Sequence, residues 1–384
     1  MPSRVALIIV TYNGEQYAED LFRSLAVDAF PKDRLGIFVV DNASTDNTVQ
    51  EITQFSSRVS PPSSRAESRD LVITLIRNTT NTGFAAGNNI AIRRALADGY
   101  EWIALLNQDT VVKSGWVEEL LRVGETDPRI GAVQPLLALW PPERGEINSL
   151  GNEIHFLGFG LSRGYHDPIN EPVIARPRRG RGNPDSGDCF ASLAMTSSEI
   201  TYASGAAVLY RAAALLDVGL FNEEFFMYHE DLDLGWRLWL RGWKSVLAPN
   251  AVVYHKYDFK AAAYKYYYME RNRLIVLLQN YKLATLVLLA PAYMLMELGL
   301  LGFSVIKGWW KEKLRGYWWV ILHAGIILKT RAAIQKSRTA SDGLITARFV
   351  GSISYQEIDN PILRFVVNPA YSLLWSLLFH LIFW

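Results

Sequence analysis

The chain has 384 residues, and 39 Lys and Arg residues nearly balance 38 Asp and Glu residues, which gives a formal net charge of +1. This balance gives no support to nucleic-acid binding, while a hydrophobic fraction of 50% supplies enough apolar side chains for a large core. The single cysteine, Cys189, excludes an intramolecular disulfide framework and a zinc site built from several cysteines.

The N-terminal part of the chain alternates between predicted strands and predicted helices. Apolar runs predict strands at "RVALIIV" (4–10), "GIFVVD" (36–41), "LVITLIR" (71–77) and "EWIALL" (101–106). Amphipathic patterns predict helices at "EQYAEDLFRSL" (15–25), from near Asp46, and at "GNNIAIRRALADG" (87–99). This alternation indicates an α/β fold with a mostly parallel sheet that helices cover on both faces.

The middle of the chain is less regular. We expect a flexible surface insertion at 56–70, and long loops at 141–195, where Gly, Pro and Arg are frequent. The segment "TYASGAAVLYR" (201–211) predicts a strand, and "FNEEFFMYHEDLDLGWRLWLRGW" (221–243) predicts a loop followed by a helix. The segment "GFGLSRG" (158–164) approximates a dinucleotide-binding pattern, but it lacks the spacing and the βαβ context, so we reject that interpretation.

The composition becomes more apolar toward the C-terminus. Residues 283–306 contain one charge, Glu297, and are long enough to span a bilayer. Two shorter apolar segments, 317–328 and 371–384, are rich in Trp and Tyr, as suits a membrane interface. The basic residues around them are Lys307, Lys311, Lys313, Arg315, Lys329, Arg331, Lys336 and Arg338. We expect contact with anionic membrane lipids on the cytoplasmic side; a buried helical subdomain is the alternative.

Polar residues follow all four N-terminal strands, in "TYN" (11–13), "DNASTDN" (41–47), "NTTNTGFAAGNN" (78–89) and "NQDT" (107–110). Ligands of parallel sheets bind beyond the carboxyl ends of the strands, so these segments predict one shared site. The Asp41 carboxylate can accept hydrogen bonds from a base or ribose, although Ser44 and Asp46 also suit helix capping. The helix start at "GFAAGNN" favours an anion such as a diphosphate, with a plain tight turn as the alternative.

Acidic residues mark two further candidates. Asp109 could hold a divalent cation, because a cation bound to a diphosphate needs few protein oxygens; helix capping is the alternative. His255 could be a second ligand at the end of a later strand, or a structural histidine. Glu230, Asp231 and Asp233 crowd the start of one helix, where capping requires a single acid. An Asp there could act as general base toward a hydroxyl.

Seven motifs occur together and in order: "IIVTYNG", "VVDNASTDNT", "NTGFAAGNN", "LLNQDT", "SGAAVLYR", "FNEEFFMYHEDLDLGWRL" and "ERNRL". As a set, over about residues 4–280, they resemble family 2 inverting glycosyltransferases, and most of all the rhamnosyltransferase-like branch. The resemblance implies the GT-A fold over 1–256, with a nucleotide-sugar half at about 1–110 and an acceptor half at about 111–256. A C-terminal helical, membrane-associated region would then occupy 257–384.

The resemblance also implies roles for single residues. The residues that match donor-binding positions are Thr11, Tyr12, Asn13, Asp41, Asn81, Gly83, Asn88, Asn107, Gln108 and Arg271. Asn107 stands where the family's DXD motif has its first Asp, so the strength of metal binding stays open. Asp109 would face Mn²⁺ or Mg²⁺, and His255 would complete that site. Asp231, beside Glu230, matches the base that deprotonates the acceptor hydroxyl.

The expected reaction is a single displacement from a nucleotide-diphosphate sugar to a lipid-linked or cell-surface glycan at the cytoplasmic face of the cell membrane. From the branch that the motifs resemble, the first expectation for the donor is dTDP-rhamnose. No Gln-x-x-Arg-Trp motif follows Asp231, which favours transfer of one or a few sugars. The alternatives are a catalytically silent nucleotide-sugar-binding or membrane scaffold protein, and a nucleotidyltransferase, which would require the basic residue that "TYNGEQY" lacks.

Overall fold

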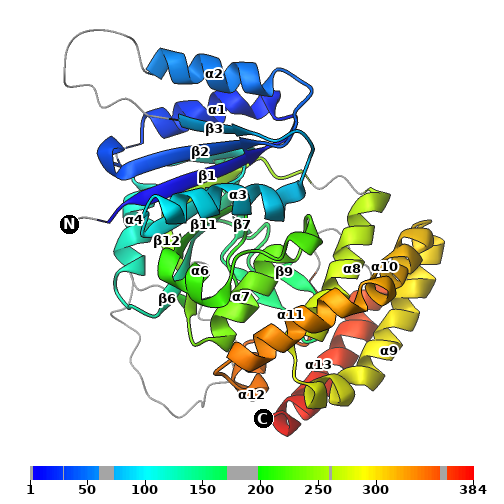
Figure 1. The fold of residues 1–384 in the computed structure, drawn as a ribbon. Coiled ribbons are helices and arrows are strands. Elements are labelled where there is room, and N and C mark those ends of the chain that lie inside the picture. Colours follow the sequence, from blue (N-terminus) through cyan, green and yellow to red (C-terminus); the bar gives the residue numbers. More distant parts are fainter. Residues whose placement is uncertain (1–2, 29, 60–72, 171–197, 259–261, 355–360) are drawn as a thin grey trace.

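The structure is a computed structural model that describes residues 3–28, 30–59, 73–170, 198–258, 262–354 and 361–384. Most of the predicted insertion at 56–70, part of the predicted loop region at 141–195, and Cys189 lie outside these residues. The described chain forms an α/β body with a group of C-terminal helices packed against one side of it (Figure 1).

The first half of the sheet confirms the predicted alternation. Its strands lie in the order β3, β2, β1, β4 and pair in parallel. They are β1 (Val5–Thr11), β2 (Leu35–Asp41), β3 (Ile73–Arg77) and β4 (Trp102–Leu106). The connecting helices are α1 (Glu15–Ala26), α2 (Thr48–Val59) and α3 (Gly83–Ala97), with a short turn, η1 (Lys32–Arg34), before β2. In Figure 1, α1 and α2 lie on one side of these strands and α3 lies on the other.

Both faces of the sheet are buried, as continuous apolar strands predict. On β1, Leu7 and Ile9 pack in one cluster with Phe22 of α1, whereas Ile8 packs in another cluster with Ile92 of α3. Successive side chains of a strand point to opposite faces, so a single apolar run supplies both layers of the core.

The sheet continues through an antiparallel strand into its second half. β11 (Ala207–Arg211) lies antiparallel between β4 and β6 (Ile130–Leu139), and β12 (Lys244–His255) pairs with β6 in parallel. The smaller members are β5 (Thr110–Val112), β7 (Ile147–Ser149) and β10 (Ser198–Glu199), which bring the sheet to ten strands within the described residues. Helices α4 (Trp116–Gly124) and α6 (Ala212–Val218) pack against this half. The predicted fold class is therefore confirmed: a mixed, mostly parallel sheet between helices.

Two local predictions need correction. The strand expected at 201–211 begins only at Ala207, because the preceding backbone bonds to side chains instead of a strand: Ser204 N donates to Gln134 Oε1 and Gly205 N to Asp231 Oδ2. The loop region after residue 141 contains a 3₁₀ turn, η2 (Pro142–Arg144), and a hairpin of β8 (Asn152–Ile154) and β9 (Gly160–Ser162). The rejected glycine pattern at 158–164 lies in this hairpin, and the described residues directly after it, 165–170, form no helix.

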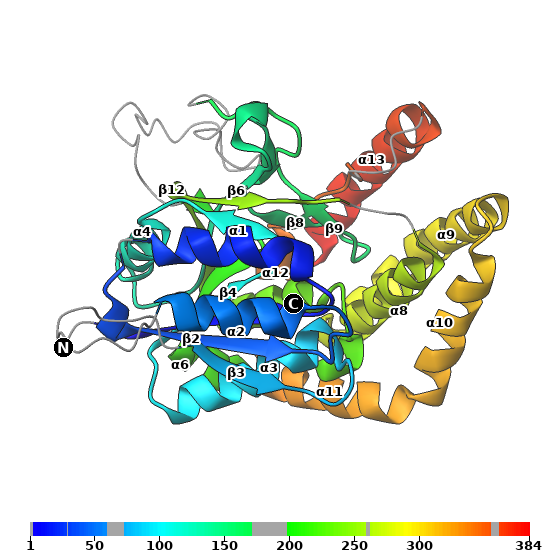
Figure 2. The same cartoon turned by 90° about the horizontal axis from the view of Figure 1, so that it is seen from above.

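Between β11 and β12 the chain forms a turn, η3 (Glu223–Phe225), and helix α7 (Glu230–Leu240), against which the C-terminal helices pack. These are α8 (Ala263–Asn280), α9 (Leu283–Ile306), α10 (Trp310–Leu322), α11 (Ala324–Ser337), α12 (Asp342–Thr346), the π-helical η4 (Leu363–Val367), α13 (Asn368–Leu378) and η5 (Phe379–Leu381). One apolar cluster joins Trp236 of α7 to Ile275, Leu289 and Trp375 of α8, α9 and α13. Seen from above, α8, α9 and α10 extend away from the body on one side (Figure 2).

Helix α9 buries polar side chains beside Leu289, Ala292 and Met296, and exposes many of its large apolar side chains. Thr285, Glu297 and Ser304 are buried, and Lys313 Nζ of α10 lies 2.8 Å from Glu297 Oε2. The exposed apolar residues of α9 and α10, here called the outer apolar face, are Leu283, Val287, Met294, Leu295, Leu298, Val305, Ile306, Trp310, Leu314, Trp318, Ile321 and Leu322. Among the described helices, α9 is long and apolar enough to cross a membrane by length and composition alone.

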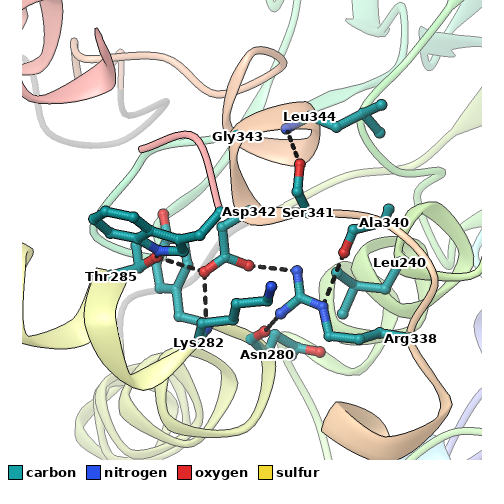
Figure 3. Close-up of polar contacts among 12 residues, drawn as sticks. Leu240, Asn280, Lys282, Thr285, Arg338, Ala340, Ser341, Asp342, Gly343 and Leu344 are labelled. Carbon is teal, nitrogen blue, oxygen red and sulfur yellow. Dashed lines mark hydrogen bonds and ion pairs between the residues drawn. The ribbon is translucent and has the colours of Figure 1, made fainter. Parts of the chain in front are cut away.

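A buried carboxylate, Asp342, ties the C-terminal helices together (Figure 3). It accepts hydrogen bonds from Lys282 N at 2.8 Å, from the Thr285 hydroxyl at the start of α9, and from Arg338. The residues just before it also hold the end of α7, because Thr339 N and Ala340 N donate to Leu240 O at 2.8 and 3.0 Å. The C-terminal helices are therefore bonded to the helix that begins with Glu230.

Candidate active site

A cavity of about 450 Å³ opens between the carboxyl ends of the central strands, the start of α7 and the start of α8. Five of the predicted site residues line it, namely Asn107, Asp109, Glu230, Asp231 and His255. They come from the end of β4, the first turn of α7 and the end of β12, segments far apart in the sequence. Because β11 runs antiparallel to β4, the loop at Gly205 reaches the same edge of the sheet.

The carboxylate of Asp231 is held by backbone groups. Its Oδ2 accepts a hydrogen bond from Gly205 N at 3.1 Å, and its Oδ1 accepts one from Leu232 N at 2.8 Å. Burial raises the pKa of Asp231, against the opposing effect of these N–H groups. A fixed carboxylate with a raised pKa suits an acceptor of protons.

The neighbouring acid, Glu230, is also held in its protonated form. Burial and the charge of Asp231 raise the pKa of Glu230 well above its ordinary value. Two interacting carboxyl groups titrate as a pair, so one of them keeps its proton after the other has lost it. With Glu230 neutral, the negative charge of this pair rests on Asp231.

The segment before α7 has an unusual backbone. Phe226, Tyr228 and His229 have φ angles of 62°, 66° and 67°, in the left-handed region that residues other than glycine rarely adopt. Burial lowers the pKa of His229 to about 4, and its Nε2 lies 3.2 Å from Gly158 O. The ring is therefore neutral and donates to that carbonyl. Strained backbone of this kind persists only where surrounding contacts hold it in place.

Asp109 and His255 form the second half of the cavity. Asp109 Oδ1 lies 3.3 Å from His255 Nε2, and His255 Nδ1 lies 2.9 Å from Asn148 Oδ1. Because an amide oxygen accepts hydrogen bonds, Nδ1 carries a hydrogen, and in the neutral ring Nε2 turns a lone pair toward the carboxylate. Burial would raise the pKa of Asp109, but a proton on His255 Nε2, with its positive charge, holds that pKa below its ordinary value.

These residues fit a divalent cation. A neutral imidazole and a carboxylate that face each other repel unless a proton or a metal ion lies between them. A histidine whose other ring nitrogen donates to a fixed oxygen, as His255 does to Asn148, is a common arrangement of metal-binding histidines. Within the described residues, no group of three or more His, Cys, Asp or Glu side chains gathers around this pair. Protein ligands alone would leave coordination positions for diphosphate oxygens.

The predicted nucleoside residues lie at the ends of β1 and β2. Gln108 bonds twice to Tyr12: Tyr12 N donates to Gln108 Oε1 at 3.0 Å, and Gln108 Nε2 donates to Tyr12 O at 3.2 Å. A Cβ on Gly14 would lie 2.2 Å from Gln108 Oε1, so only glycine leaves room for that side chain. Gln108 therefore fixes the loop after β1, and the Tyr12 side chain is 44% exposed beside it.

Asp41 is buried at the end of β2. Its two oxygens accept Ser44 N at 3.3 Å, and Oδ1 lies 3.5 Å from the Thr11 hydroxyl. Asn13, at φ 48°, accepts Thr45 N at 2.8 Å through its side chain. These contacts bring the predicted residues of the first two strand ends together.

The start of α3 differs from the expectation of a diphosphate site. Phe84 N and Ala85 N donate to Phe226 O at 2.7 and 3.2 Å, so these two helix N-terminal groups are engaged by the chain itself. Gly83 has φ 80°, and a Cβ there would lie 2.5 Å from the Phe226 ring. Asn81 accepts Gly83 N, and Asn88 donates to Phe84 O, both at 2.9 Å. The loop is thus built around Phe226.

Arg271 lies outside the cavity lining. It is buried on α8, where its guanidinium donates to Glu224 O and, at 3.1 Å, to Phe225 O. The predicted donor contact of this residue stays a prediction, and in the structure its charged group faces the loop before α7.

Two models of known protein families match the chain. The model described as Glycosyl transferase family 2 matches residues 6–139, and the model described as Glycosyl transferase family group 2 matches residues 187–330. The chain belongs to glycosyl transferase family 2.

Two curated relatives of this glycosyltransferase differ in how much they share with it. The N-acetylglucosaminyl-diphospho-decaprenol L-rhamnosyltransferase of Mycobacterium tuberculosis is 25% identical over 365 residues, covering 91% of this chain and all of that protein. The poly(ribitol-phosphate) β-N-acetylglucosaminyltransferase TarS of Staphylococcus aureus is 30% identical over 92 residues, which are 24% of this chain and 14% of TarS. The recognised branch, a rhamnosyltransferase-like member of family 2, is therefore confirmed.

A solved structure supports the fold of the glycosyltransferase. GalNAc-T7 with UDP, GalNAc and Mn²⁺ superposes with a TM-score of 0.52 at 13% identity, covering 72% of this chain and 47% of that chain. At this identity the likeness shows the GT-A fold alone.

Three contributors to the glycosyltransferase site were missed in the sequence. Asn148 orients His255, Gly205 donates to Asp231, and Asn272 donates to the loop before α7. Gly205 could have been suspected from "ASGAA", since a glycine beside a strand often marks a close approach of the backbone. Asn148 lies in a segment without a pattern, and nothing in "ERNRL" distinguishes Asn272 as a donor to a loop.

Proposed function

We propose that this glycosyltransferase moves a sugar from a nucleotide-diphosphate donor to a hydroxyl of a lipid-linked or cell-surface glycan, with inversion at the anomeric carbon. The observation that carries the proposal is the shared cavity: Asp231 lines it together with Asp109 and His255. One group suits proton removal, and the other two suit a cation on the leaving diphosphate. An inverting displacement needs these two functions in one enclosed space.

The chain's own residues divide the reaction as follows. Asp231, fixed by Gly205 N and Leu232 N, accepts the proton of the acceptor hydroxyl as its oxygen bonds to the anomeric carbon. The bond from that carbon to the diphosphate oxygen breaks in the same step, and the electron pair leaves with the nucleotide diphosphate. Asp109 and His255 would hold a divalent cation, which when bound neutralises charge on the diphosphate. No covalent intermediate with the enzyme is required.

Rhamnose is the proposed sugar and dTDP-rhamnose the proposed donor. The support is the M. tuberculosis relative, whose entire length matches 91% of this chain. Its name specifies rhamnosyl transfer to a lipid-linked diphosphate. The same name supports a lipid-linked acceptor. A catalytically silent sugar-binding protein is the competing function, and it would place no proton acceptor at the start of α7.

Association with the cytoplasmic face of the cell membrane is part of the proposal. The outer apolar face of α9 and α10 supports it, because a helix in water buries most of its large apolar side chains, whereas α9 buries Thr285, Glu297 and Ser304 and exposes Leu283, Val287, Met294, Leu295, Leu298, Val305 and Ile306. Trp310 and Trp318 lie on that face, and exposed Lys307, Lys311 and Arg315 suit anionic headgroups beside it.

The reaction is tested by incubating detergent-purified protein with Mn²⁺ or Mg²⁺, a panel of nucleotide sugars and a polyprenyl-diphosphate sugar acceptor. Release of nucleotide diphosphate from one donor should require the metal, and Asp109→Asn should lower that release by roughly 100-fold. A protein that binds donors but releases none with any acceptor would instead support the silent binding function.

Membrane association is tested by flotation with vesicles that contain anionic lipid. The double variant Leu298→Glu and Trp318→Glu should lose flotation, because it places charges on the outer apolar face. Leu216→Glu is the matched control, since Leu216 is 70% exposed on α6 of the body. Equal flotation of both variants would contradict the proposed surface.

A further inference from the structure

The loop before α7 poses a physical problem. Phe226, Tyr228 and His229 all adopt left-handed backbone angles, which cost about 1–3 kcal/mol each for such residues. Glycine would adopt these angles without that cost, yet glycine occupies none of the three positions. The contacts around the loop must therefore hold it, and those contacts determine where Asp231 lies.

Asn272 of α8 supplies the central contact. It is fully buried, and its Nδ2 lies 2.9 Å from Phe225 O, 2.9 Å from Met227 O and 2.8 Å from Tyr228 O. One amide group thus faces three carbonyls of the strained loop. In a buried setting, loss of that donor would remove a hydrogen bond from each carbonyl, and of the three only Phe225 O would keep Arg271 as a side-chain donor.

Arg271 aligns that amide. Its Nε donates to Asn272 Oδ1 at 2.9 Å, which leaves Asn272 Nδ2 facing the loop. Its Nη2 donates to Phe225 O as well, at 3.1 Å. The guanidinium lies 4.4 Å from the centre of the Trp319 ring of α10, so the helical region also holds the arginine. We call Arg271 and Asn272 the α8 clamp.

The same loop also reaches the donor side. Phe226 O accepts both Phe84 N and Ala85 N, and the Phe226 ring stacks on Tyr268 of α8 at 5.1 Å. At its other end, α7 is bonded to the segment before α12 through Leu240 O. The C-terminal helices thus contact α7 at both ends, and the clamp lies at the end that carries Asp231.

We infer that Asn272, aligned by Arg271, is a positioning residue for the proton acceptor: it holds the strained loop that sets the place and the burial of Glu230 and Asp231. The expected change in kinetics rests on the proposed function. The expected change in the loop rests on the backbone geometry alone. Arg271 and Asn272 of "ERNRL" would then support Asp231 from the C-terminal helices, a role distinct from contact with a phosphate.

The test compares Asn272→Leu with Asn280→Leu in the full chain. Both asparagines are fully buried on α8, but the Asn280 amide donates to Asp233 Oδ1 at 2.9 Å and leaves the loop untouched. Hydrogen–deuterium exchange over residues 222–230 should become faster in Asn272→Leu and stay near wild type in Asn280→Leu. This readout requires no substrate, so it decides the clamp even if no donor is turned over.

With an active donor and acceptor, kcat of Asn272→Leu should fall about 100-fold, more than the donor KM rises, since a misplacement of about 1 Å has such an effect. The acid limb of its pH–rate profile should move to lower pH, because water reaching the loop reduces the burial that raises the pKa of Asp231. Asn280→Leu should keep the wild-type limb.

Unchanged exchange in Asn272→Leu, or equal changes in both variants, would overturn the clamp. An inactive wild type that shows the expected exchange difference would leave the clamp standing and count against the proposed reaction. An active wild type whose Asn272→Leu variant keeps its kcat and acid limb would refute the positioning role and spare the reaction.

Discussion

Two parts of the candidate site are supported in different ways. At the ends of β1 and β4, where we propose donor contacts, Gln108 and Tyr12 bond to each other from neighbouring strands, so the sheet itself sets their positions. In the other part, Asp231 begins a helix whose preceding loop is strained and is held by α8. The sheet alone can therefore position Gln108 and Tyr12, whereas the position of Asp231 depends on a helix that follows it in the sequence.

The largest expected effect distinguishes the two parts directly. Asp231→Asn should lower kcat by about 1,000-fold or more while donor binding stays close to wild type, because it removes the proton acceptor and keeps the cavity. Steady-state release of nucleotide diphosphate and calorimetric donor binding measure the two effects. Glu224→Gln, an exposed change in the same loop, is the control. Loss of donor binding in Asp231→Asn would contradict the division.

A smaller effect is expected where a side chain only orients a ligand. Asn148→Leu should weaken apparent metal affinity by about 10–100-fold, since it removes the acceptor of the His255 Nδ1 hydrogen. Asn148→Asp retains an acceptor and should keep tight binding. Titration of activity with Mn²⁺ measures both. Equal weakening in the two variants would show that Asn148 acts through packing instead.

The contact between the two parts can be tested by stability. Gly83→Ala should lower the free energy of unfolding by about 2–4 kcal/mol. The alanine would have to adopt the positive φ of Gly83, and its Cβ would lie 2.5 Å from the Phe226 ring. Gly99, at the other end of α3, has φ 76° and open space, so Gly99→Ala should cost only about 1 kcal/mol. Chemical denaturation measures the difference, and similar costs would mean that Phe226 yields easily.

The smallest expected effect is a pH dependence. Burial and Asp231 raise the pKa of Glu230 in the folded state, so the protonated group favours folding at low pH and this contribution is lost as pH rises above the unfolded pKa. Glu230→Gln does not titrate. Its Tm should therefore exceed that of wild type increasingly with pH, by about 2–4 °C for each unit of pKa difference. A Tm difference that is constant from pH 5 to pH 8 would contradict this.

The sequence predicted the first half of the sheet best. Consecutive parallel strands bring their carboxyl ends to one edge, so Asp41 and Asp109 could be placed from strand patterns alone. Asp231 could be suspected because it lies among three acids at one helix start. Each of these predictions depends on local periodicity or on a rule of sheet topology.

The remaining contacts could not be predicted for an equally physical reason. The partners of Asn272 are backbone carbonyls, which every residue carries and no pattern marks. Likewise, the hydropathy of residues 283–306 indicates an apolar helix but not which side is buried. The engagement of Phe84 N and Ala85 N by Phe226 O joins segments that lie far apart in the sequence.

The buried polar face of α9 has a consequence for biosynthesis. Glu297 meets Arg273, which precedes it in the chain, and Lys313, which follows it. As the chain emerges from the ribosome, α8 and α9 can pair first through Arg273, and Lys313 completes the cluster when α10 follows. A chain interrupted between α9 and α10 would keep both acids of the cluster, Glu270 and Glu297, but only one of its cations, Arg273. Quality-control proteases would then meet a helical pair with an unneutralised carboxylate.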